Sequence, residues 1–160
     1  ESGEPMIIEV REISIAVKDA EAVARKFAAL GFEPSPLWKD ATPLIEATGA
    51  SMRLPNTHIG IMASIGEKTP ISRFIDKRGE GFFSITLLVT RIEDVMENWR
   101  KEGVDFVLDA PLEFEDYLNV GRVVVPRMRV NWTRPSTLHG LCIELHEFRD
   151  RNGNSFYPHE

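Results

Sequence analysis

The sequence contains a single cysteine, Cys142, among its 160 residues. An internal disulfide is therefore excluded, and the composition fits a reducing compartment, most simply the cytoplasm. Long apolar runs are also missing, because none approaches the roughly 20 residues that a membrane-spanning helix needs. We therefore expect no membrane partner.

Positive charge is in deficit, with 19 Lys and Arg against 25 Asp and Glu, for a net charge of −6. No basic stripe of the kind that binds nucleic acid is visible, so nucleic acid is not expected as a partner. Arginines do gather late in the chain, at Arg122, Arg127, Arg129 and Arg134. They form either a solvated charged face or a clamp for an anionic ligand.

Two segments of the chain, 12–33 and 84–105, repeat each other at a constant offset of 72 residues. Each opens with a strand pattern and continues into a helix whose apolar residues recur every three to four positions. The offset pairs Ile13 with Ile85, Val17 with Val89, Phe27 with Trp99 and Gly31 with Gly103. Two unrelated βα units are the alternative, but the gapless register favours a true repeat.

Three strand-like runs follow each βα start, so each half is predicted as a βαβββ module. The first half has runs at 51–54 and 57–63 with a weaker one between them, and the second has runs at 104–108, at 121–126 or 128–132, and at 141–148. The segment 113–124 is interpreted as an insertion. Between the halves we expect a short helix with Thr69 as N-cap, Pro70 in the first turn and Gly79 after its end.

These elements predict an α+β fold made of tandem modules. The boundaries that we infer are a disordered tail or cloning remnant at 1–6, a first module at 7–66, a linker helix at 67–81, a second module at 82–148 and a polar C-terminal tail at 149–160.

Four stretches of the chain carry a family resemblance: "ISIAVKD" (13–19), "IGEKTPISRFIDKRGEG" (65–81), "IEDVMENWRKEGV" (92–104) and "RPSTLHGLCIEL" (134–145). They resemble methylmalonyl-CoA epimerases, which belong to the vicinal oxygen chelate superfamily of glyoxalases, bleomycin resistance proteins and dioxygenases. The resemblance implies a cupped mixed sheet, and an isomerase that acts on an acyl thioester. It also implies a homodimer, the commonest symmetric assembly.

The resemblance further implies a divalent metal held by His, Gln or Glu, His and Glu, one from each of four strands. The corresponding positions here are Glu12, Gly60, Ser84 and Glu144. Of these, only Glu144 is the expected type, and Glu12 is a possible oxygen substitute. Glycine has no donor, and a neutral serine hydroxyl is a poor ligand. The offset of 72 independently relates Glu12 to Ser84.

A metal site at different residues is a second possibility. Period two places His58 on the face of Gly60, and His146 on the face of Glu144. Together with Glu12, these two histidines and Glu144 would form an N₂O₂ set suited to Zn, Fe, Co or Ni. Alternatively, both histidines are ordinary surface or hydrogen-bonded residues. We therefore expect either no cofactor or a divalent metal ion at a non-standard site.

For catalysis, the resemblance implies two carboxylates that remove and return a proton next to a carbonyl. The candidates are Glu144 and Glu46, which precedes a strand. The alternatives are a structural Glu144 paired with Arg129 or Arg134, and a solvated Glu46. Candidate substrate-binding residues are hydroxyl donors, aromatic residues and one cation: Ser14, Ser84, Thr86, Phe82, Trp132 and Arg134.

These residues support several functions. The first is a methylmalonyl-CoA-epimerase-like isomerase or lyase-type enzyme that acts on an activated carbonyl or acyl thioester without the usual metal. The second is a metal-free protein of the same fold that sequesters a small molecule. The third is a pseudoenzyme that retains only the fold and its assembly surface.

Overall fold

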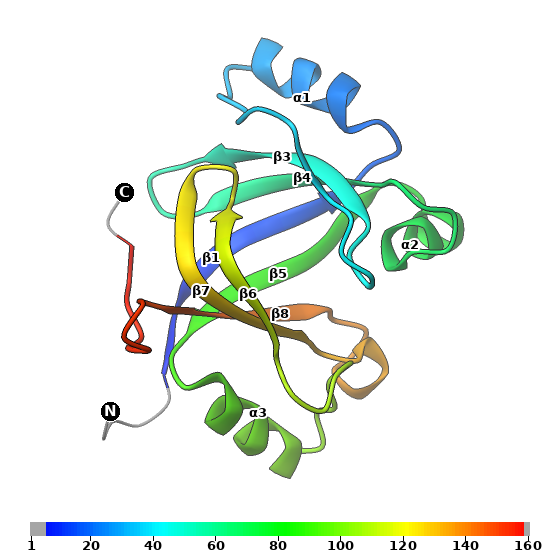
Figure 1. Ribbon diagram of the computed structural model, residues 1–160. Helices are drawn as coiled ribbons and strands as arrows, with labels where there is room; N and C mark the ends of the chain where they lie inside the picture. Colours follow the sequence, from blue (N-terminus) through cyan, green and yellow to red (C-terminus); the bar gives the residue numbers. More distant parts are fainter. Residues whose placement is uncertain (1–5, 159–160) are drawn as a thin grey trace. The chain divides into compact units, whose positions relative to one another are not determined.

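The computed structural model describes residues 6–158 (Figure 1). In chain order the elements are β1 (Ile7–Ala16), α1 (Ala20–Ala29), β2 (Trp38–Asp40), β3 (Ala47–Arg53), β4 (His58–Ser64), α2 (Pro70–Arg78), β5 (Gly81–Val89), α3 (Ile92–Lys101), β6 (Leu112–Asn119), β7 (Val123–Trp132), a 3₁₀ turn (Pro135–Thr137) and β8 (Ile143–Arg149). They fall into two compact units. The N-terminal unit comprises Glu12–Phe83 and Val120–Arg122, and the C-terminal unit comprises the other described residues.

The N-terminal unit has the strand order β2-β3-β4-β1, in which β1 runs parallel to β4 and the other neighbours are antiparallel. Helix α1 packs its apolar side on one face of this sheet, around Val17, Met52 and Ile61. Asp19 caps the helix by accepting a hydrogen bond from the Ala22 N–H at 2.9 Å. Gly31 ends it with a φ of 103°, a backbone conformation that favours glycine.

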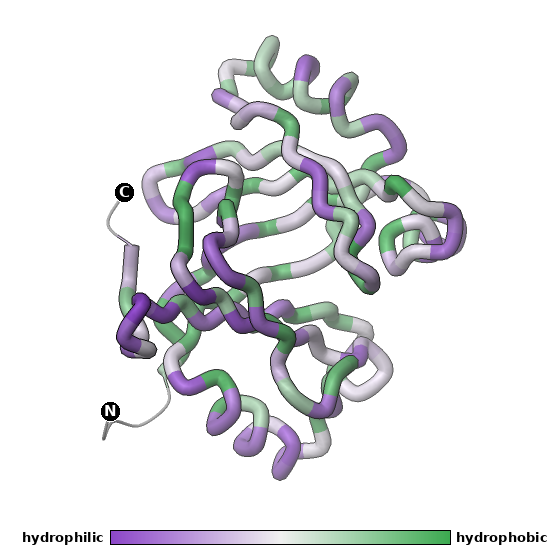
Figure 2. Tube along the Cα trace, viewed as in Figure 1, coloured by the Kyte–Doolittle hydropathy of each residue, from purple (hydrophilic) through white to green (hydrophobic). Residues whose placement is uncertain are grey.

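The C-terminal unit repeats this build with the strand order β5-β8-β7-β6, in which β5 and β8 are parallel. Helix α3 covers one face, where Val89, Ile92, Met96 and Leu145 form a buried core. Figure 2 shows hydrophilic and hydrophobic residues alternating along α1 and α3, as expected of helices with one buried side. The predicted α+β fold class of tandem βαβββ modules is confirmed.

Helix α2 also follows its sequence signals. Thr69 Oγ1 accepts from the Ser72 N–H at 3.1 Å, and the Thr69 N–H donates to Ser72 Oγ at 2.9 Å. This reciprocal pair is a capping box, here closed by serine. Gly79 follows the helix with a φ of 80°. The apolar side of α2 packs against Ala16 and Ala47, so this helix belongs to the N-terminal unit.

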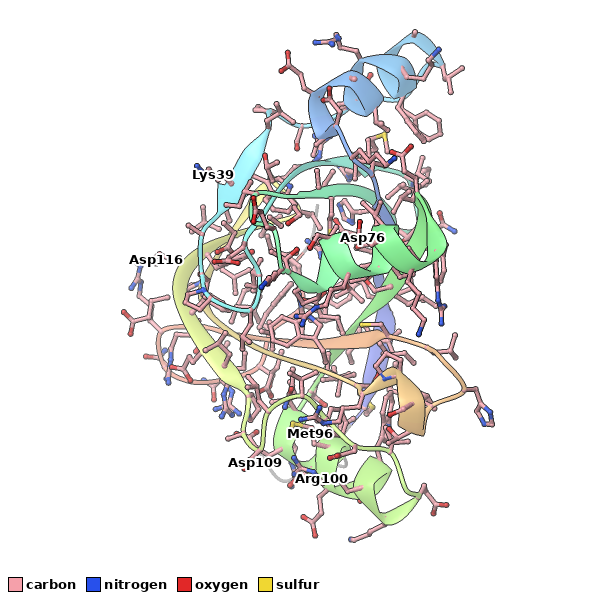
Figure 3. All side chains as sticks on the ribbon, turned by 90° about the vertical axis from the view of Figure 1, so that its right-hand side faces the viewer. Lys39, Asp76, Met96, Arg100, Asp109 and Asp116 are labelled. Carbon is pink, nitrogen blue, oxygen red and sulfur yellow. The ribbon has the colours of Figure 1, made fainter. Side chains whose placement is uncertain are left out.

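Three strand predictions were wrong. The run at 104–108 is a loop, in which only Phe106 makes an isolated bridge. The Arg100 guanidinium donates to the Asp109 carbonyl at 2.9 Å, and both residues are labelled in Figure 3. Asn131 donates to the Leu108 carbonyl at 2.8 Å. Two backbone hydrogen bonds flank the Phe106 bridge, from the Val107 N–H to the Trp132 carbonyl and from the Arg134 N–H to the Asp105 carbonyl, both at 2.8 Å. The pairing stops there, and side-chain bonds hold the rest of the loop.

The second wrong prediction is the insertion at 113–124, which contains most of β6 and the turn into β7. Glu113, Glu115 and Asp116 make this stretch look like a loop. However, β6 is the edge strand of its unit, where charged side chains discourage pairing with another chain. The third concerns the weaker run of the first half. Residues 54–57, between β3 and β4, form a turn and not a strand. The third strand of this half is β2, which precedes β3.

The predicted tails differ in what the structure shows of them. Residues 1–5 and 159–160 lie outside the described part of the chain. The stretch predicted as a C-terminal tail begins inside β8 and folds back, so that the Phe156 N–H donates to the Phe148 carbonyl at 3.0 Å. Over residues 6–158, no helix has both the length and the apolar character needed to cross a membrane.

Candidate functional site

In the N-terminal unit, the Glu12 carboxylate lies beside Gly60 of the neighbouring strand β4. It accepts hydrogen bonds from Ser14 Oγ at 3.1 Å and from Ser51 Oγ at 2.9 Å. Gly60 pairs with Ser14 on one side and with Ser51 on the other, so it lies between the two serines. A Cβ atom at Gly60 would stand 2.6 Å from the Glu12 carboxyl carbon. A side chain at this position would therefore have to displace the Glu12 carboxylate, which occupies that space.

In the C-terminal unit, the Glu144 carboxylate is held by two partners. Its Oε1 lies 2.8 Å from His146 Nε2, and its Oε2 accepts from Thr86 Oγ1 at 3.3 Å. Glu144 and His146 share a face of β8, while Thr86 is the residue opposite Glu144 on β5. The Glu144 side chain is 18% exposed, so the carboxylate is largely enclosed but can still be reached.

Behind His146 runs a buried chain of polar side chains. Asn119 Nδ2 lies 3.3 Å from His146 Nδ1, and Arg11 Nε donates to Asn119 Oδ1 at 3.0 Å. The Arg11 guanidinium also stacks over the Phe148 ring, 5.4 Å from its centroid. Sequence reasoning missed both Arg11 and Asn119. The only signal was Arg11 itself, a charged residue inside the largely apolar strand β1.

The remaining residues predicted to bind substrate or to act in catalysis differ in exposure and position. Ser84 is buried on the strand that carries Thr86, and Trp132 is the residue opposite Glu144 on β7. Phe82 is 52% exposed. Glu46 is exposed in the N-terminal unit, directly before β3 as expected, with a φ of 43°.

The two arginines considered as structural partners of Glu144 have other partners. Arg134 lies 3.5 Å from an Asp105 oxygen and donates to the Phe106 carbonyl at 3.1 Å, which anchors the loop after α3. Arg129 forms ion pairs with Glu93 and Glu113. Arg134 therefore acts in loop anchoring, and the described partners of Glu144 are His146 and Thr86.

The residues considered for a metal are split between the units. Glu12 and the buried His58, which opens β4, belong to the N-terminal unit, while Glu144 and His146 belong to the C-terminal unit. Within residues 6–158, no group of three or more His, Cys, Asp or Glu side chains is placed to hold a metal ion.

Cys142 lies close to this site in sequence, and its thiol is strongly shielded. Burial, and secondarily the charge of Glu144, raise the pKa of Cys142 to about 12. A raised thiol pKa favours the neutral form in the folded protein. The stability linked to this group is thus complete below about pH 8.5, the ordinary thiol value, and declines as the pH rises toward the folded pKa.

We expect iodoacetamide at about pH 8.5 to alkylate Cys142 roughly tenfold or more slowly in the folded protein than in urea, because the thiolate is the reactive form. Mass spectrometry of timed aliquots measures both rates. A free-cysteine peptide of the same local sequence, with and without urea, controls for the effect of urea on the reagent. Equal rates for folded and unfolded protein would contradict the shielding of this thiol.

Comparison with known families agrees with this architecture. Residues 11–118, more than half of the chain, match the model of the Glyoxalase/Bleomycin resistance protein/Dioxygenase superfamily. The chain belongs to this superfamily. Asn119, Glu144 and His146 lie beyond the matched residues. A search of curated protein sequences found no match.

Several solved protein structures have a fold similar to that of this chain. A hypothetical protein from Bacillus halodurans is 23% identical with a TM-score of 0.72, over 91% of this chain and 98% of that one. Methylmalonyl-CoA epimerase from Mycobacterium tuberculosis is 22% identical with a TM-score of 0.74, over 91% of each chain. A variant of the Streptomyces coelicolor epimerase, solved with 2-nitronate-propionyl-CoA, is 19% identical with a TM-score of 0.73, over 88% and 97%. The chain is similar in fold to methylmalonyl-CoA epimerases.

Proposed function

We propose that this protein is an isomerase of the epimerase type. It removes and returns the proton on the carbon next to the carbonyl of an acyl thioester, with Glu144 as the proton-accepting group. The observation that carries this proposal is the setting of the Glu144 carboxylate, whose Oε1 lies 2.8 Å from His146 Nε2 and whose Oε2 accepts from Thr86 Oγ1. A carboxylate has about four acceptor positions, so each oxygen keeps capacity for a substrate proton.

The proposed step is a proton transfer that balances on its own. The substrate C–H bond breaks, an O–H bond forms on Glu144, and the electron pair moves into the carbonyl to give an enolate. Return of a proton to the opposite face inverts the carbon. Thr86 and Ser14 already donate to carboxylates, so Ser84 is the remaining candidate to donate to the enolate oxygen.

A metal of the kind implied by the family does not fit the corresponding residues. Gly60 has no donor atom, and the space beside it is filled by Glu12. Both Glu12 oxygens accept hydrogen bonds from serine hydroxyls, and Ser84 offers only a neutral hydroxyl. Such a set lacks the imidazole ligands that Ni, Co or Zn sites favour. We therefore propose a reaction that does not use the usual metal site.

The substrate class is inferred from the relatives. The Streptomyces coelicolor epimerase was solved with a CoA thioester, which makes acyl-CoA thioesters the first compounds to test. We further propose that the protein works in the cytoplasm as a two-fold homodimer. The single cysteine and the frequency of two-fold dimers support this assignment.

The test is deuterium incorporation at the α carbon of methylmalonyl-CoA in D₂O, followed by mass spectrometry, with and without EDTA. We expect exchange above a Glu144→Gln control, and an equal rate in EDTA. No exchange above that control would overturn the proposal for this substrate. Loss of exchange in EDTA would overturn its metal-free part.

Small-molecule binding without turnover is the second candidate function. The observation that favours it is that Glu12, one of the residues considered for a metal, is engaged by two serine hydroxyls. A panel of acyl-CoA thioesters would then raise the melting temperature without deuterium exchange. A panel that leaves the melting temperature unchanged would remove the support for this candidate.

Glu46 is the proposed second acid–base carboxylate. This role predicts an effect on the stereochemistry of the product. If Glu46 is the second acid–base group, Glu46→Gln should keep exchange for one stereoisomer while epimerisation falls about 10²-fold or more. Chiral analysis of the product beside deuterium counting measures both. Glu67→Gln, which changes another exposed glutamate of the same unit, is the matched control. Unchanged epimerisation in Glu46→Gln would exclude Glu46 from catalysis.

A further inference from the structure

We propose that Asn119 is a positioning residue that fixes the tautomer of His146, and through it the orientation of the Glu144 carboxylate. The inference rests on the proposed function only in taking Glu144 as the proton acceptor. Asn119 does not contact Glu144. It acts through His146, whose Nδ1 faces Asn119 while its Nε2 faces Glu144.

In the hydrogen-bonded series Arg11–Asn119–His146, the chemistry of the side chains determines which group donates and which accepts. Arginine has donors and no acceptor, so the Asn119 atom that faces Arg11 Nε at 3.0 Å is the amide oxygen. The Asn119 NH₂ group then faces His146 and donates to Nδ1. The same NH₂ group lies 3.6 Å from the sulfur of Met128, a weak acceptor, which agrees with this orientation.

The tautomer of the neutral imidazole is determined by this contact. When Nδ1 accepts a hydrogen bond, the ring proton lies on Nε2, and it points at Glu144 Oε1 at 2.8 Å. The opposite tautomer would place two lone pairs against each other at that contact. The contact of Oε1 with His146 is shorter than the 3.3 Å contact of Oε2 with Thr86, so Oε2 is the more weakly held oxygen and the one assigned to receive the substrate proton.

Packing holds these hydrogen-bonded side chains in one arrangement. Arg11, Asn119 and His146 are all buried, so water cannot easily replace a missing partner. Arg11 is held by the Phe148 ring and lies 3.6 Å from Glu9. Asn119 ends β6 directly before the turn residues Val120 and Gly121, which both have positive φ. Its position is therefore set by a hairpin as well as by its hydrogen bonds.

The test is ¹⁵N NMR of protein labelled at histidine nitrogen, which distinguishes protonated from unprotonated ring nitrogens. The His146 signals are assigned with a His146→Gln variant, because the chain has four histidines. We expect the wild-type ring to carry its proton on Nε2. In Asn119→Asp, a carboxylate still accepts from Arg11 but cannot donate to Nδ1, so Nδ1 takes up a proton from water and donates to the new carboxylate. Asn98→Asp makes the same substitution at an exposed site and should leave the spectrum unchanged.

A wild-type ring protonated on Nδ1 would overturn the inference without any variant. So would an unchanged His146 spectrum in folded Asn119→Asp. In the exchange assay, Asn119→Asp should lower kcat about tenfold to 100-fold with little change in KM, since proton transfer depends on orientation. An unchanged kcat would overturn the positioning role. If His146 has the predicted tautomer but the protein shows no proton exchange, the proposed function is rejected and the inference about the tautomer stands.

Discussion

Replacing Glu144 with glutamine should lower the rate of α-proton exchange by about 10²- to 10⁴-fold, the usual contribution of a positioned acid–base group. Glutamine keeps the size of the side chain, and its amide oxygen can still accept from His146. However, an amide does not take up a proton at neutral pH. Deuterium counting by mass spectrometry at saturating substrate measures the loss directly.

Two controls separate chemistry from folding in this experiment. Glu97→Gln neutralises an exposed carboxylate on α3 whose described partner is Lys101, and it should exchange at the wild-type rate. Circular dichroism and the melting temperature show whether Glu144→Gln retains the fold. A folded Glu144→Gln protein with the exchange rate of Glu97→Gln would show that Glu144 is not the proton acceptor.

The fold could be predicted largely from local patterns, because the physics that sets them is local. Asp19 before an apolar helix and Gly31 after it define the helix ends without knowledge of the rest of the chain. The repeat at an offset of 72 residues then relates the two halves. The patterns failed at 104–108 and in β6, where side chains from distant residues, or the needs of an edge strand, decide the conformation.

The site could be predicted only in part. Alternation along a strand was enough to place His146 beside Glu144. It could not supply the partners of His146, because Asn119 is 27 residues away and Arg11 is a further 108 residues from Asn119. Likewise the sequence shows that Gly60 has no ligand atom, but not that Glu12 occupies the space above it. Contacts between residues far apart in the sequence produce no regular spacing from which they could be predicted.

The largest stability change is expected for Glu147→Gln. Glu147 is 0% exposed and points to the face of β8 opposite Glu144. Its carboxylate accepts from the Arg91 N–H at 2.5 Å, from Arg149 Nε at 2.9 Å and from Ser155 Oγ at 3.1 Å. Arg91 precedes α3 with a φ of 52° and provides no side-chain cap, so Glu147 satisfies the N-terminal end of this helix.

Removing this charge should lower the free energy of unfolding by about 3–5 kcal/mol, because one partner of a buried, hydrogen-bonded ion pair is lost. Urea unfolding measures the change. Glu93→Gln is the matched control, since Glu93 pairs with Arg129 and Arg149 in the same network but is 48% exposed. It should cost about 0–1 kcal/mol.

Salt provides an independent check on the same pair of variants. The distance beyond which salt screens exposed charges falls from roughly 10 Å at about 0.1 M to roughly 3 Å at about 1 M, whereas buried pairs are screened much less. The difference in stability between wild type and Glu147→Gln should therefore persist at high salt, while the smaller difference for Glu93→Gln shrinks. Equal losses in the two variants, or equal sensitivity to salt, would mean that burial does not set the contribution of Glu147 and that the cap on α3 comes from elsewhere.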